Sequence, residues 1–392
     1  MSCLRRHSRP RSPAVKTPLE DDDLLSEILL RLPPQPSSLP RASLVCKRWR
    51  SLASDRGFFR RFRRHHRRNP PLLGIFNRDA NLSFIPTLEA PNRVPPGRFS
   101  LQPGDGSRFL SLGCRHGLVL TIDVKPKQML VWDPVTGDQH RLDIPPGLAT
   151  HAEKMTINGA VLRVGGVAHF QVVLAVNGND DKQHEQVLAR VYSSATGLWG
   201  DLISTRLPSE VPRSGCPTLV FTGKTAVMAG GSLYWILAGN FAGILEFDLE
   251  KQSLGVIQVP VHMLEEGDYQ FSIMRAEGGG LGLLFQTDLS FQLWKRKTDC
   301  DGVDSWALGR TIELDKLLCL DLWSGVMILG FAENNNVVFF WTSGNLFMVH
   351  LESLQFKKLF ETTILPHYHP FETVYTADVG VGHDGVDPFH NT

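Results

Sequence analysis

The order of apolar and polar residues divides the chain into a short helical part and a long β-rich part. The first helical pattern consists of aliphatic residues three and four positions apart: Leu24, Leu25, Ile28, Leu29 and Leu32. Residues 20–23 are all acidic, which suits the amino end of a helix because carboxylates accept hydrogen bonds from its free amides. Pro33 and Pro34 end the pattern, since proline cannot continue a helix. The spacing therefore predicts a helix that stops before Pro33.

A second helical pattern follows and predicts one further amphipathic helix. Its apolar positions are Leu39, Ala42, Val45, Cys46, Trp49 and Leu52. A third, shorter piece places Phe58, Phe59 and Phe62 among arginines. A module of roughly 45 residues is small for an independent core. It therefore either packs against a neighbouring domain or leaves apolar surface for a partner.

From residue 72 onward the helical period fades, and short β-branched and aromatic runs alternate with Gly, Asp, Asn and Pro turns. The runs that we predict as strands include residues 117–122, 129–133, 172–176, 232–237, 243–249, 282–286, 291–295, 336–341 and 345–351. Such short strands separated by turn residues indicate an all-β fold.

The strands repeat loosely, and each repeat has an apolar anchor followed by a polar turn and another short strand. The anchors are Trp132, Tyr192, Phe247, Trp294 and Val349, spaced 60, 55, 47 and 55 residues apart. This spacing fits four-stranded propeller blades with loop insertions. Residues 72–112 supply a sixth unit, and a strand at 371–379, with Phe371, Val374 and Tyr375, closes the ring. The prediction is a β-propeller of about six blades; an open β-sandwich or two β-subdomains are the alternatives.

The charge distribution places a boundary between the two parts. Residues 1–68 carry 17 Lys and Arg against 6 Asp and Glu, whereas the rest carries 24 against 34, although the whole chain is only +1. Asn69, Pro70 and Pro71 mark the change and read as a linker. The predicted organisation is a disordered basic tail (1–18), a helical module (19–68), a linker (69–71), a β domain (72–380) and a flexible tail (381–392).

Residues 21–55 resemble the F-box motif. The matching features are Leu-Leu-x-Glu-Ile-Leu at 24–29, Leu32-Pro33, and Val-Cys-Lys-x-Trp-Arg at 45–50. The resemblance implies binding to a Skp-family adaptor and, through it, to a cullin–RING ubiquitin ligase. It also implies that these residues build the module and its adaptor surface: Leu24, Leu25, Ile28, Leu29, Leu32, Pro33, Leu39, Val45, Cys46 and Trp49.

The β-rich part resembles the kelch-like, F-box-associated domains of plant F-box proteins, in residues 117–122, 131–137 and 232–249. Together the two resemblances imply a non-catalytic, substrate-recruiting subunit of a Skp–cullin–F-box ubiquitin ligase, whose propeller binds a target protein. The alternative is a propeller scaffold or small-molecule enzyme whose helices only cap the propeller.

The sequence offers little catalytic chemistry, and we expect no catalytic residues, cofactor or metal. The glycines at 278–282 precede a strand, so we predict a turn and not a phosphate loop. His367, His369, His383 and His390 lack zinc-site spacing and read as loose surface histidines. The arginines at 60–68 read as a solvated helix face in preference to a nucleic-acid site, because the remaining chain is acidic.

Targeting signals and cysteine usage favour an intracellular protein in the nucleus, the cytoplasm or both. The six cysteines are scattered and form no Cys-x-x-Cys pair, which indicates a reducing compartment. No apolar stretch approaches the length of a membrane span, and no secretory signal is expected. Residues 5–11 are basic and read either as a nuclear import signal or as part of a disordered tail.

Overall fold

The computed structural model describes residues 21–77, 82–101, 109–123, 125, 127–148, 156–164, 169–179, 184–208, 217–239, 241–260, 263, 271–287, 290–318, 325–363 and 367–376. The predicted tails at 1–18 and 381–392 lie outside these residues. Two compact units are present: the helices up to His66 form one, and the other runs from Arg67 to Val374. The predicted linker at 69–71 begins just inside the second unit, and the predicted domain limits stay a prediction.

The helical unit contains four short helices: α1 (Asp22–Leu30), α2 (Ser38–Ser43), α3 (Lys47–Ala53) and α4 (Arg56–His65). Acidic side chains start two of them. Asp21 accepts hydrogen bonds from the amides of Asp23 (2.9 Å) and Leu24 (3.1 Å), and Asp55 accepts one from Phe58 (2.6 Å). Each bond satisfies an amide that has no partner inside its own helix.

The core of the helical unit is built from α1, α2 and α4. Its fully buried side chains are Leu25, Leu29, Leu39, Phe58 and Phe62. At the surface, Arg61 on α4 forms an ion pair with Glu27 on α1 at 3.0 Å and donates to the Ser26 hydroxyl at 3.2 Å. The last turn of α1 is held as well, because a ring nitrogen of His66 lies 2.9 Å from the Leu30 carbonyl oxygen.

The prediction of one continuous second helix is wrong. The pattern is interrupted at residues 44–46, between α2 and α3. Cys46 adopts an extended conformation (φ −162°, ψ 171°), so the chain cannot continue the helix through it. The interruption changes the direction of the chain and leaves Leu44 and Val45 exposed.

The second unit is a six-bladed β-propeller, as the sequence predicts. Blade 2 contains β3 (Phe109–Arg115), β4 (Leu118–Asp123), β5 (Gln128–Trp132) and β6 (Gln139–Asp143). Blade 3 contains β7 (Ile157–Val164), β8 (His169–Asn179), β9 (Glu185–Ser193), β10 (Leu198–Trp199) and β11 (Ile203–Arg206). Blade 4 contains β12 (Leu219–Val220), β13 (Val227–Ala229), β14 (Ser232–Ala238), β15 (Gly243–Asp248) and β16 (Ser253–Ile257).

The remaining blades complete the ring. Blade 5 contains β17 (Phe271–Arg275), β18 (Leu281–Gln286), β19 (Ser290–Thr298) and β20 (Asp304–Glu313), followed by the short helix α6 (Leu314–Leu318). Blade 6 contains β21 (Val326–Ala332), β22 (Val337–Thr342), β23 (Asn345–His350) and β24 (Phe356–Glu361). Blade 1 is three-stranded and combines β25 (Tyr368–Glu372), β1 (Leu72–Asn77) and β2 (Phe84–Pro86).

The repeat read from the sequence corresponds to one position in the blades. Each predicted anchor lies on the strand that is third in the hydrogen-bonded order of its blade, where β12 and β13 both pair with β14 and count as one position. The anchors are Trp132 on β5, Tyr192 on β9, Phe247 on β15, Trp294 on β19 and Val349 on β23. The inner strands contact one another around the ring, β3 with β7, β13 with β17, β21 with β25, and β25 with β3. The repeat is therefore a blade.

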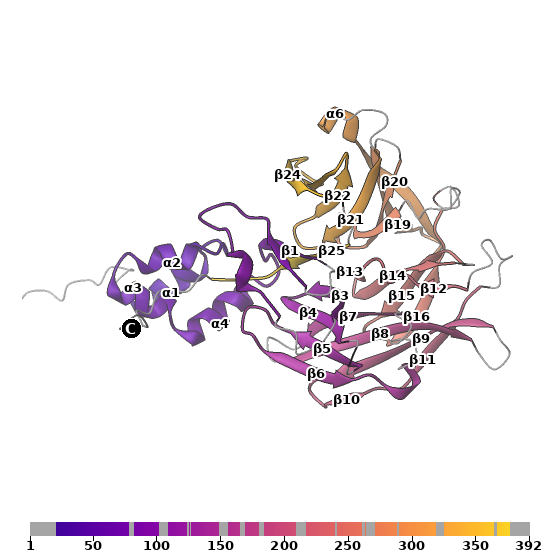
Figure 1. The fold of residues 1–392 in the computed structure, drawn as a ribbon, viewed down its shortest axis with the longest axis horizontal. Coiled ribbons are helices and arrows are strands. Elements are labelled where there is room, and N and C mark those ends of the chain that lie inside the picture. The colour runs from indigo at the N-terminus through magenta and orange to yellow at the C-terminus, as the bar shows by residue number, and fades with distance from the viewer. Residues whose placement is uncertain are drawn as a thin grey trace, which may run out of the picture. The chain divides into compact units, whose positions relative to one another are not determined.

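The chain closes the propeller by pairing its last described strand with its first. β25 runs antiparallel to β1, with Phe76 opposite His369 and Asn77 opposite Tyr368 (Figure 1). Closure by a C-terminal strand is as predicted, but the strand is 368–372 and not 371–379. Val374 and Tyr375 are buried beyond its end, and residues 377–379 lie outside the described residues.

The predicted composition of the sixth unit also needs correction. Residues 72–112 supply only two strands of blade 1, because Phe109 starts the first strand of blade 2. Residues 98–101 are not a strand, since a 3-10 turn occupies Pro96–Arg98. Phe99 instead inserts its ring beside Phe84 and Phe371, at centroid distances of 5.0 and 5.4 Å.

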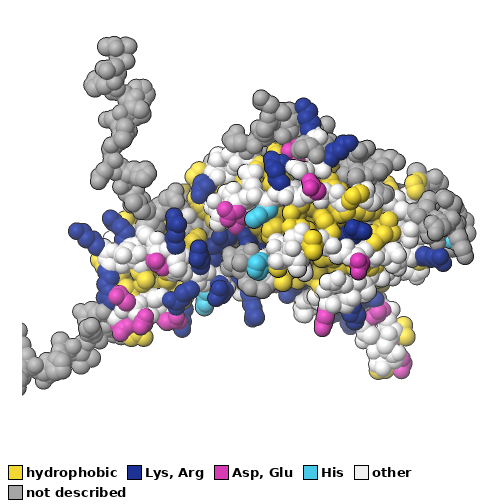
Figure 2. Space-filling view, turned by 90° about the horizontal axis from the view of Figure 1, so that it is seen from below, with side chains coloured by type: hydrophobic (Ala, Val, Ile, Leu, Met, Phe, Trp, Pro, Cys, Tyr) yellow, Lys and Arg dark blue, Asp and Glu magenta, His cyan; other side chains and the backbone are white. Residues whose placement is uncertain are grey.

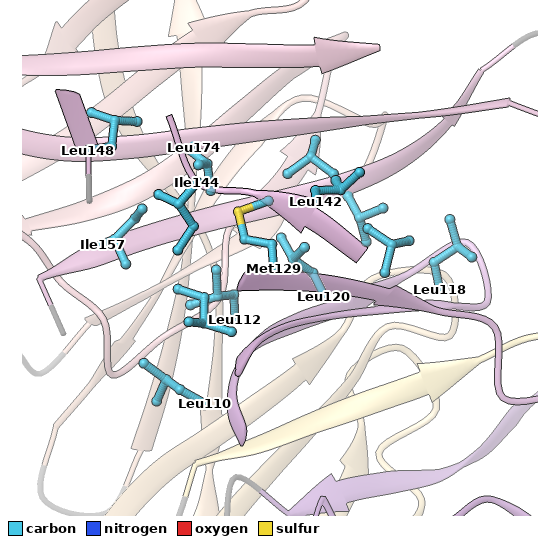
Figure 3. Packing of buried hydrophobic residues seen from close by; sticks show 14 of the residues in the cluster. Leu110, Leu112, Leu118, Leu120, Met129, Leu142, Ile144, Leu148, Ile157 and Leu174 are labelled. Atoms are coloured by element: carbon cyan, nitrogen blue, oxygen red, sulfur yellow. The ribbon is translucent and has the colours of Figure 1, made fainter. Parts of the chain in front are cut away.

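Aliphatic side chains fill the spaces between neighbouring blades. Between blades 2 and 3, Leu112, Leu120 and Met129 from one sheet meet Ile157 and Leu174 from the other (Figure 3). All five are buried. Because each blade buries one face against the next, the stability of the ring depends on every blade being in place.

An ion pair joins three blades near the axis. Arg115, at the end of β3, pairs with Glu333, which follows β21, and also donates to the Ala226 carbonyl at 2.6 Å. Glu333 in turn accepts from the amide of Met228 on β13 at 3.2 Å. The side chains of Arg115 and Glu333 are only 7% and 16% exposed. Removing one partner of a charge pair this well buried strongly destabilises the fold, because the other charge stays buried without compensation.

Substitution of Phe371 tests ring closure. The ring is fully buried and lies 5.1 Å from Phe76, so Phe371→Ala removes contacts on which β25 and β1 both depend. We expect the free energy of unfolding in urea to fall by about 3–5 kcal/mol. Phe356→Ala is the control, because Phe356 is 47% exposed at the outer edge of blade 6. An equal loss in both variants would contradict a closing role for β25.

Substitution of Arg115 tests the axial ion pair. Arg115→Met leaves Glu333 buried without its partner, and we expect the free energy of unfolding to fall by about 3–5 kcal/mol. Adding Glu333→Leu should recover much of that loss, because no charge is then left unpaired. Lys316→Met, which breaks an exposed pair with Glu313, should leave the urea midpoint unchanged. Failure of the double variant to recover stability would show that the charges themselves are not the cause.

Candidate functional site

The helical unit exposes aliphatic side chains that contribute little to its own core. Leu24 is 50% exposed, Ile28 39%, Leu44 75% and Val45 62%. We call these four residues the exposed aliphatic set. Two of them lie on α1 and two lie in the break before α3. Aliphatic side chains grouped on so small a unit indicate a surface that a partner covers.

Helix geometry separates the buried from the exposed residues of α1. Leu24 and Ile28 are four positions apart and share one side, whereas Leu25 and Leu29 share the adjacent, buried side. The Asp21 cap at the first turn fixes where the helix starts. The same leucine-rich stretch therefore serves two purposes, with one stripe for the core and one for the surface.

The break between α2 and α3 has a defined conformation. The amide of Leu44 donates to the Arg41 carbonyl and that of Val45 to the Ala42 carbonyl, both at 3.2 Å. These bonds close the last turn of α2, and a bond of 3.0 Å from Arg50 to the Cys46 carbonyl begins the next helix. The chain between them is short and held at both ends, so the exposed side chains are presented from a fixed corner.

One contact relates this corner to α1. The guanidinium Nε of Arg48, near the start of α3, lies 2.7 Å from a carboxylate oxygen of Asp22 in the first turn of α1. The starts of the two helices are thereby held near each other. An exposed pair of this kind adds little stability, but it restricts how the two helices are oriented.

The structure sorts the ten residues that the sequence predicted for the adaptor surface. Five are exposed: Leu24, Ile28, Pro33, Val45 and Cys46. Two are partly exposed, Leu32 and Trp49, and three are buried, Leu25, Leu29 and Leu39. The buried three support the surface from within, and a direct role in contacting a partner is proposed only for the exposed and partly exposed residues.

Sequence reasoning missed Leu44, which is the most exposed aliphatic residue of the set. Its position does not fit the helical period through Leu39, Ala42 and Val45, so it looked like part of the polar face. Two adjacent aliphatic residues, Leu44 and Val45, just before Cys46 were the available signal for a break in the helix.

Charged side chains of both signs are exposed on the helical unit, with Asp22, Asp23 and Glu27 on α1 beside Leu24 and Ile28. Arg41, Lys47 and Arg50 are exposed near the break, and Arg60 and Arg64 are exposed on α4. Figure 2 shows many Lys and Arg side chains over the helical unit. The charge is therefore positive beside Leu44 and Val45 and mixed beside Leu24 and Ile28.

Two sequence predictions about possible chemistry in the propeller, for the glycines at 278–282 and for His369, can be compared with the structure. The glycines at 278–282 include a hairpin turn between β17 and β18, with φ of +92° at Gly278 and +89° at Gly279. The amide of Ala276 donates to the Gly280 carbonyl at 2.8 Å, so the predicted turn is confirmed. His369 is buried, which corrects its prediction as a surface residue.

The described part of the chain contains neither a cluster of metal ligands nor a helix suited to a membrane. No group of three or more His, Cys, Asp or Glu there is arranged to hold a metal ion. Among the helices of that same part, none is long and apolar enough to span a bilayer.

Comparison with known proteins places both units in one class, that of F-box proteins. The F-box domain family matches residues 21–61, and the family described as "F-box protein AT5G49610-like, beta-propeller" matches residues 111–377. The chain belongs to this second family. It is also similar to the putative F-box/kelch-repeat protein At1g15680 of Arabidopsis thaliana, with 25% identity over 322 residues that cover 76% of this chain and 73% of that protein.

Solved propellers are only distantly similar. The periplasmic gluconolactonase PpgL of Pseudomonas aeruginosa has 11% identity and a TM-score of 0.39, covering 75% of this chain and 82% of that one. The WD40 domain of SCAP from fission yeast has 10% identity and a TM-score of 0.30, covering 67% and 56%. At these scores neither structure informs the function.

The two stripes of α1 should respond differently to truncation. Leu25→Ala opens a cavity in the core, and we expect amides of the helical unit to exchange hydrogen much faster in the full-length chain. Leu24→Ala removes an exposed side chain and should leave those rates within about threefold of the wild type. Hydrogen exchange read by mass spectrometry over residues 21–66 measures both. Equal acceleration would mean that Leu24 is a core residue.

Proposed function

We propose that this chain is the substrate-recruiting subunit of a Skp–cullin–F-box ubiquitin ligase. In this proposal the helical unit binds a Skp-family adaptor, which connects it to a cullin–RING ligase, and the propeller binds a target protein. Membership of an F-box family supports the first half, and the exposed aliphatic set is the observation that carries it. The site of action would be intracellular, in the nucleus, the cytoplasm or both.

The exposed aliphatic set has the properties of an interface core. Aliphatic anchors inside a polar rim supply most of the binding energy in protein complexes. Here Leu24 and Ile28 extend from a capped helix, and Leu44 and Val45 extend from a corner that is hydrogen-bonded on both sides. Because these positions are already ordered, little conformational entropy is lost when a partner binds.

The propeller contributes by proximity and supplies no reacting group of its own in this proposal. A rigid ring holds the bound target at a limited distance from a ubiquitin-charged enzyme, which raises the effective concentration of its lysines. The blades are packed against each other by buried aliphatic residues, so loops at the ends of the strands can differ between proteins without disturbing the cores.

The alternative from the sequence, in which the helices only cap the propeller, makes a different prediction about the exposed aliphatic set. A cap would use these aliphatic residues to pack against the propeller, and their substitution would then lower stability without affecting the binding of any partner. Adaptor binding therefore separates the two functions.

Charged substitutions in the exposed aliphatic set should abolish adaptor binding. We expect Ile28→Glu and Val45→Glu each to weaken binding of a purified Skp-family adaptor by at least about 30-fold, as loss of an interface anchor typically does. Binding is measured by calorimetry with the full-length chain. Leu25 is unsuitable for this test, because its burial means that substitution also disrupts the fold.

Leu308→Glu provides the matched control, since Leu308 is 49% exposed on β20 of the propeller. It should bind the adaptor like the wild type. If the wild-type chain binds no Skp-family adaptor, or if all three variants bind it equally well, the proposed function is wrong. The helical content of each variant, followed by circular dichroism, confirms that the module is still folded.

A further inference from the structure

A cavity lies on the propeller axis, at the end where the inner strands begin. Its volume is about 30 Å³, and its lining comes from the inner strands of four blades. Ser272 is the second residue of β17, Ile328 lies early in β21, and His369 lies early in β25. Lys224 reaches the cavity from the connection between β12 and β13.

Lys224 brings a positive charge into this cavity, and none of the described residues that line it carries an opposite charge. Its ammonium donates to the Phe271 carbonyl at 3.1 Å and to the Ser272 hydroxyl, which are both neutral acceptors. An ammonium has three N–H groups, and the described residues offer no acceptor to the third. The described residues that line the cavity include no Asp or Glu.

Burial lowers the pKa of the Lys224 ammonium, as expected for a charge without a nearby opposite charge. The low-dielectric surroundings lower the pKa of Lys224 to about 8. In the described residues no carboxylate lies close enough to restore it. The amide of Asn158 also holds the Lys224 backbone in place, by donating to its carbonyl at 3.0 Å, so the lysine is fixed from a neighbouring blade.

Two other cations in the described interior of the propeller are neutralised. Arg115 pairs with Glu333, and Arg163 pairs with Asp133, with both partners of each pair mostly buried. Burying a charge without a partner destabilises a fold strongly, so such groups are usually paired with an opposite charge or serve in binding. Lys224 departs from this rule at a place where a cavity gives access to its ammonium.

We propose that this axial cavity is a binding site for an oxyanion, a carboxylate or a phosphate, which is neutralised by the ammonium of Lys224. The Ser272 hydroxyl and the ring of His367, which both line the cavity, add polar contacts. Apolar residues complete the lining, among them Ile236, Ile273 and Leu329, and the small volume leaves room for the anionic group alone. The proposal concerns the propeller alone and does not depend on adaptor binding.

Two sources of such an anion share this chemistry. One is a free small molecule, and the other is an acidic or phosphorylated side chain of a bound protein. Ser272, Ile328 and His369 line the cavity from early positions in their strands, whereas Pro70 and Pro71 contact Asn335 and Thr373 beyond the ends of β21 and β25. The first residues of the propeller unit therefore lie toward the opposite end of the strands from these lining residues.

Thermal denaturation of the full-length chain with inorganic phosphate or succinate tests the proposal. Either anion should raise the unfolding temperature of the wild type in a saturable way, because a ligand that binds only the folded state stabilises it. Lys224→Met keeps the length of the side chain and removes its charge, so the shift should disappear. Lys251→Met is the matched control, because Lys251 is exposed and paired with Asp248, and it should retain the wild-type shift.

Labelling of the wild type gives a second measurement that needs no variant to fold. Reductive methylation with formaldehyde and cyanoborohydride attacks neutral amines, so Lys224 should react faster than Lys251, and phosphate should slow only Lys224. Unchanged labelling of Lys224 at saturating phosphate and succinate would overturn the proposal. So would a wild-type temperature shift that survives in Lys224→Met.

The dependence of binding on pH follows from the groups that face the cavity. These are Lys224, His367, His369 and Tyr368, and the described residues add no acid. Anion affinity should fall about tenfold per pH unit above pH 8, where Lys224 loses its proton. A phosphoserine peptide that competes better than phosphate would identify a protein side chain as the source, and competition by free anions alone would identify a small molecule.

Discussion

The pairing of β25 with β1 is the constraint on which the rest of the propeller depends. A sheet edge must be paired or covered, and here the edge of the first strand is paired by the last. Phe371 carries this closure into the core, where it packs with Phe76 and Phe99. Only a closed ring brings blades 2, 4 and 6 together around Arg115 and Glu333, and only a closed ring forms the cavity at Lys224.

The helical unit is too small to bury all of its aliphatic side chains. Helix α1 divides them into a buried and an exposed stripe. Two of the exposed positions arise only because Cys46 breaks the helical pattern. The features that limit the core of this unit are therefore the same ones that provide a surface for a partner.

Charge is used in two ways along the propeller axis. At one end, Arg115 and Glu333 neutralise each other and hold three blades in register. Toward the other end, Lys224 is held by neutral oxygens and keeps its charge available. The first arrangement is structural and insensitive to ligands, whereas the second makes the affinity of the axial cavity depend on the sign of what enters it.

The sequence alone determined the first helix, most strands, the turn at 278–282 and the blade repeat, because these depend on local periodicity and turn residues. It could not decide which residues of α1 face outward, since both stripes are aliphatic. Nor could it place the closing strand, because His369 and Pro370 interrupt the apolar pattern and only pairing with β1 makes the segment a strand. The axial cavity was equally hidden, since Lys224 and His367 meet only when the ring closes, and contacts between residues so distant along the chain exist in the tertiary structure alone.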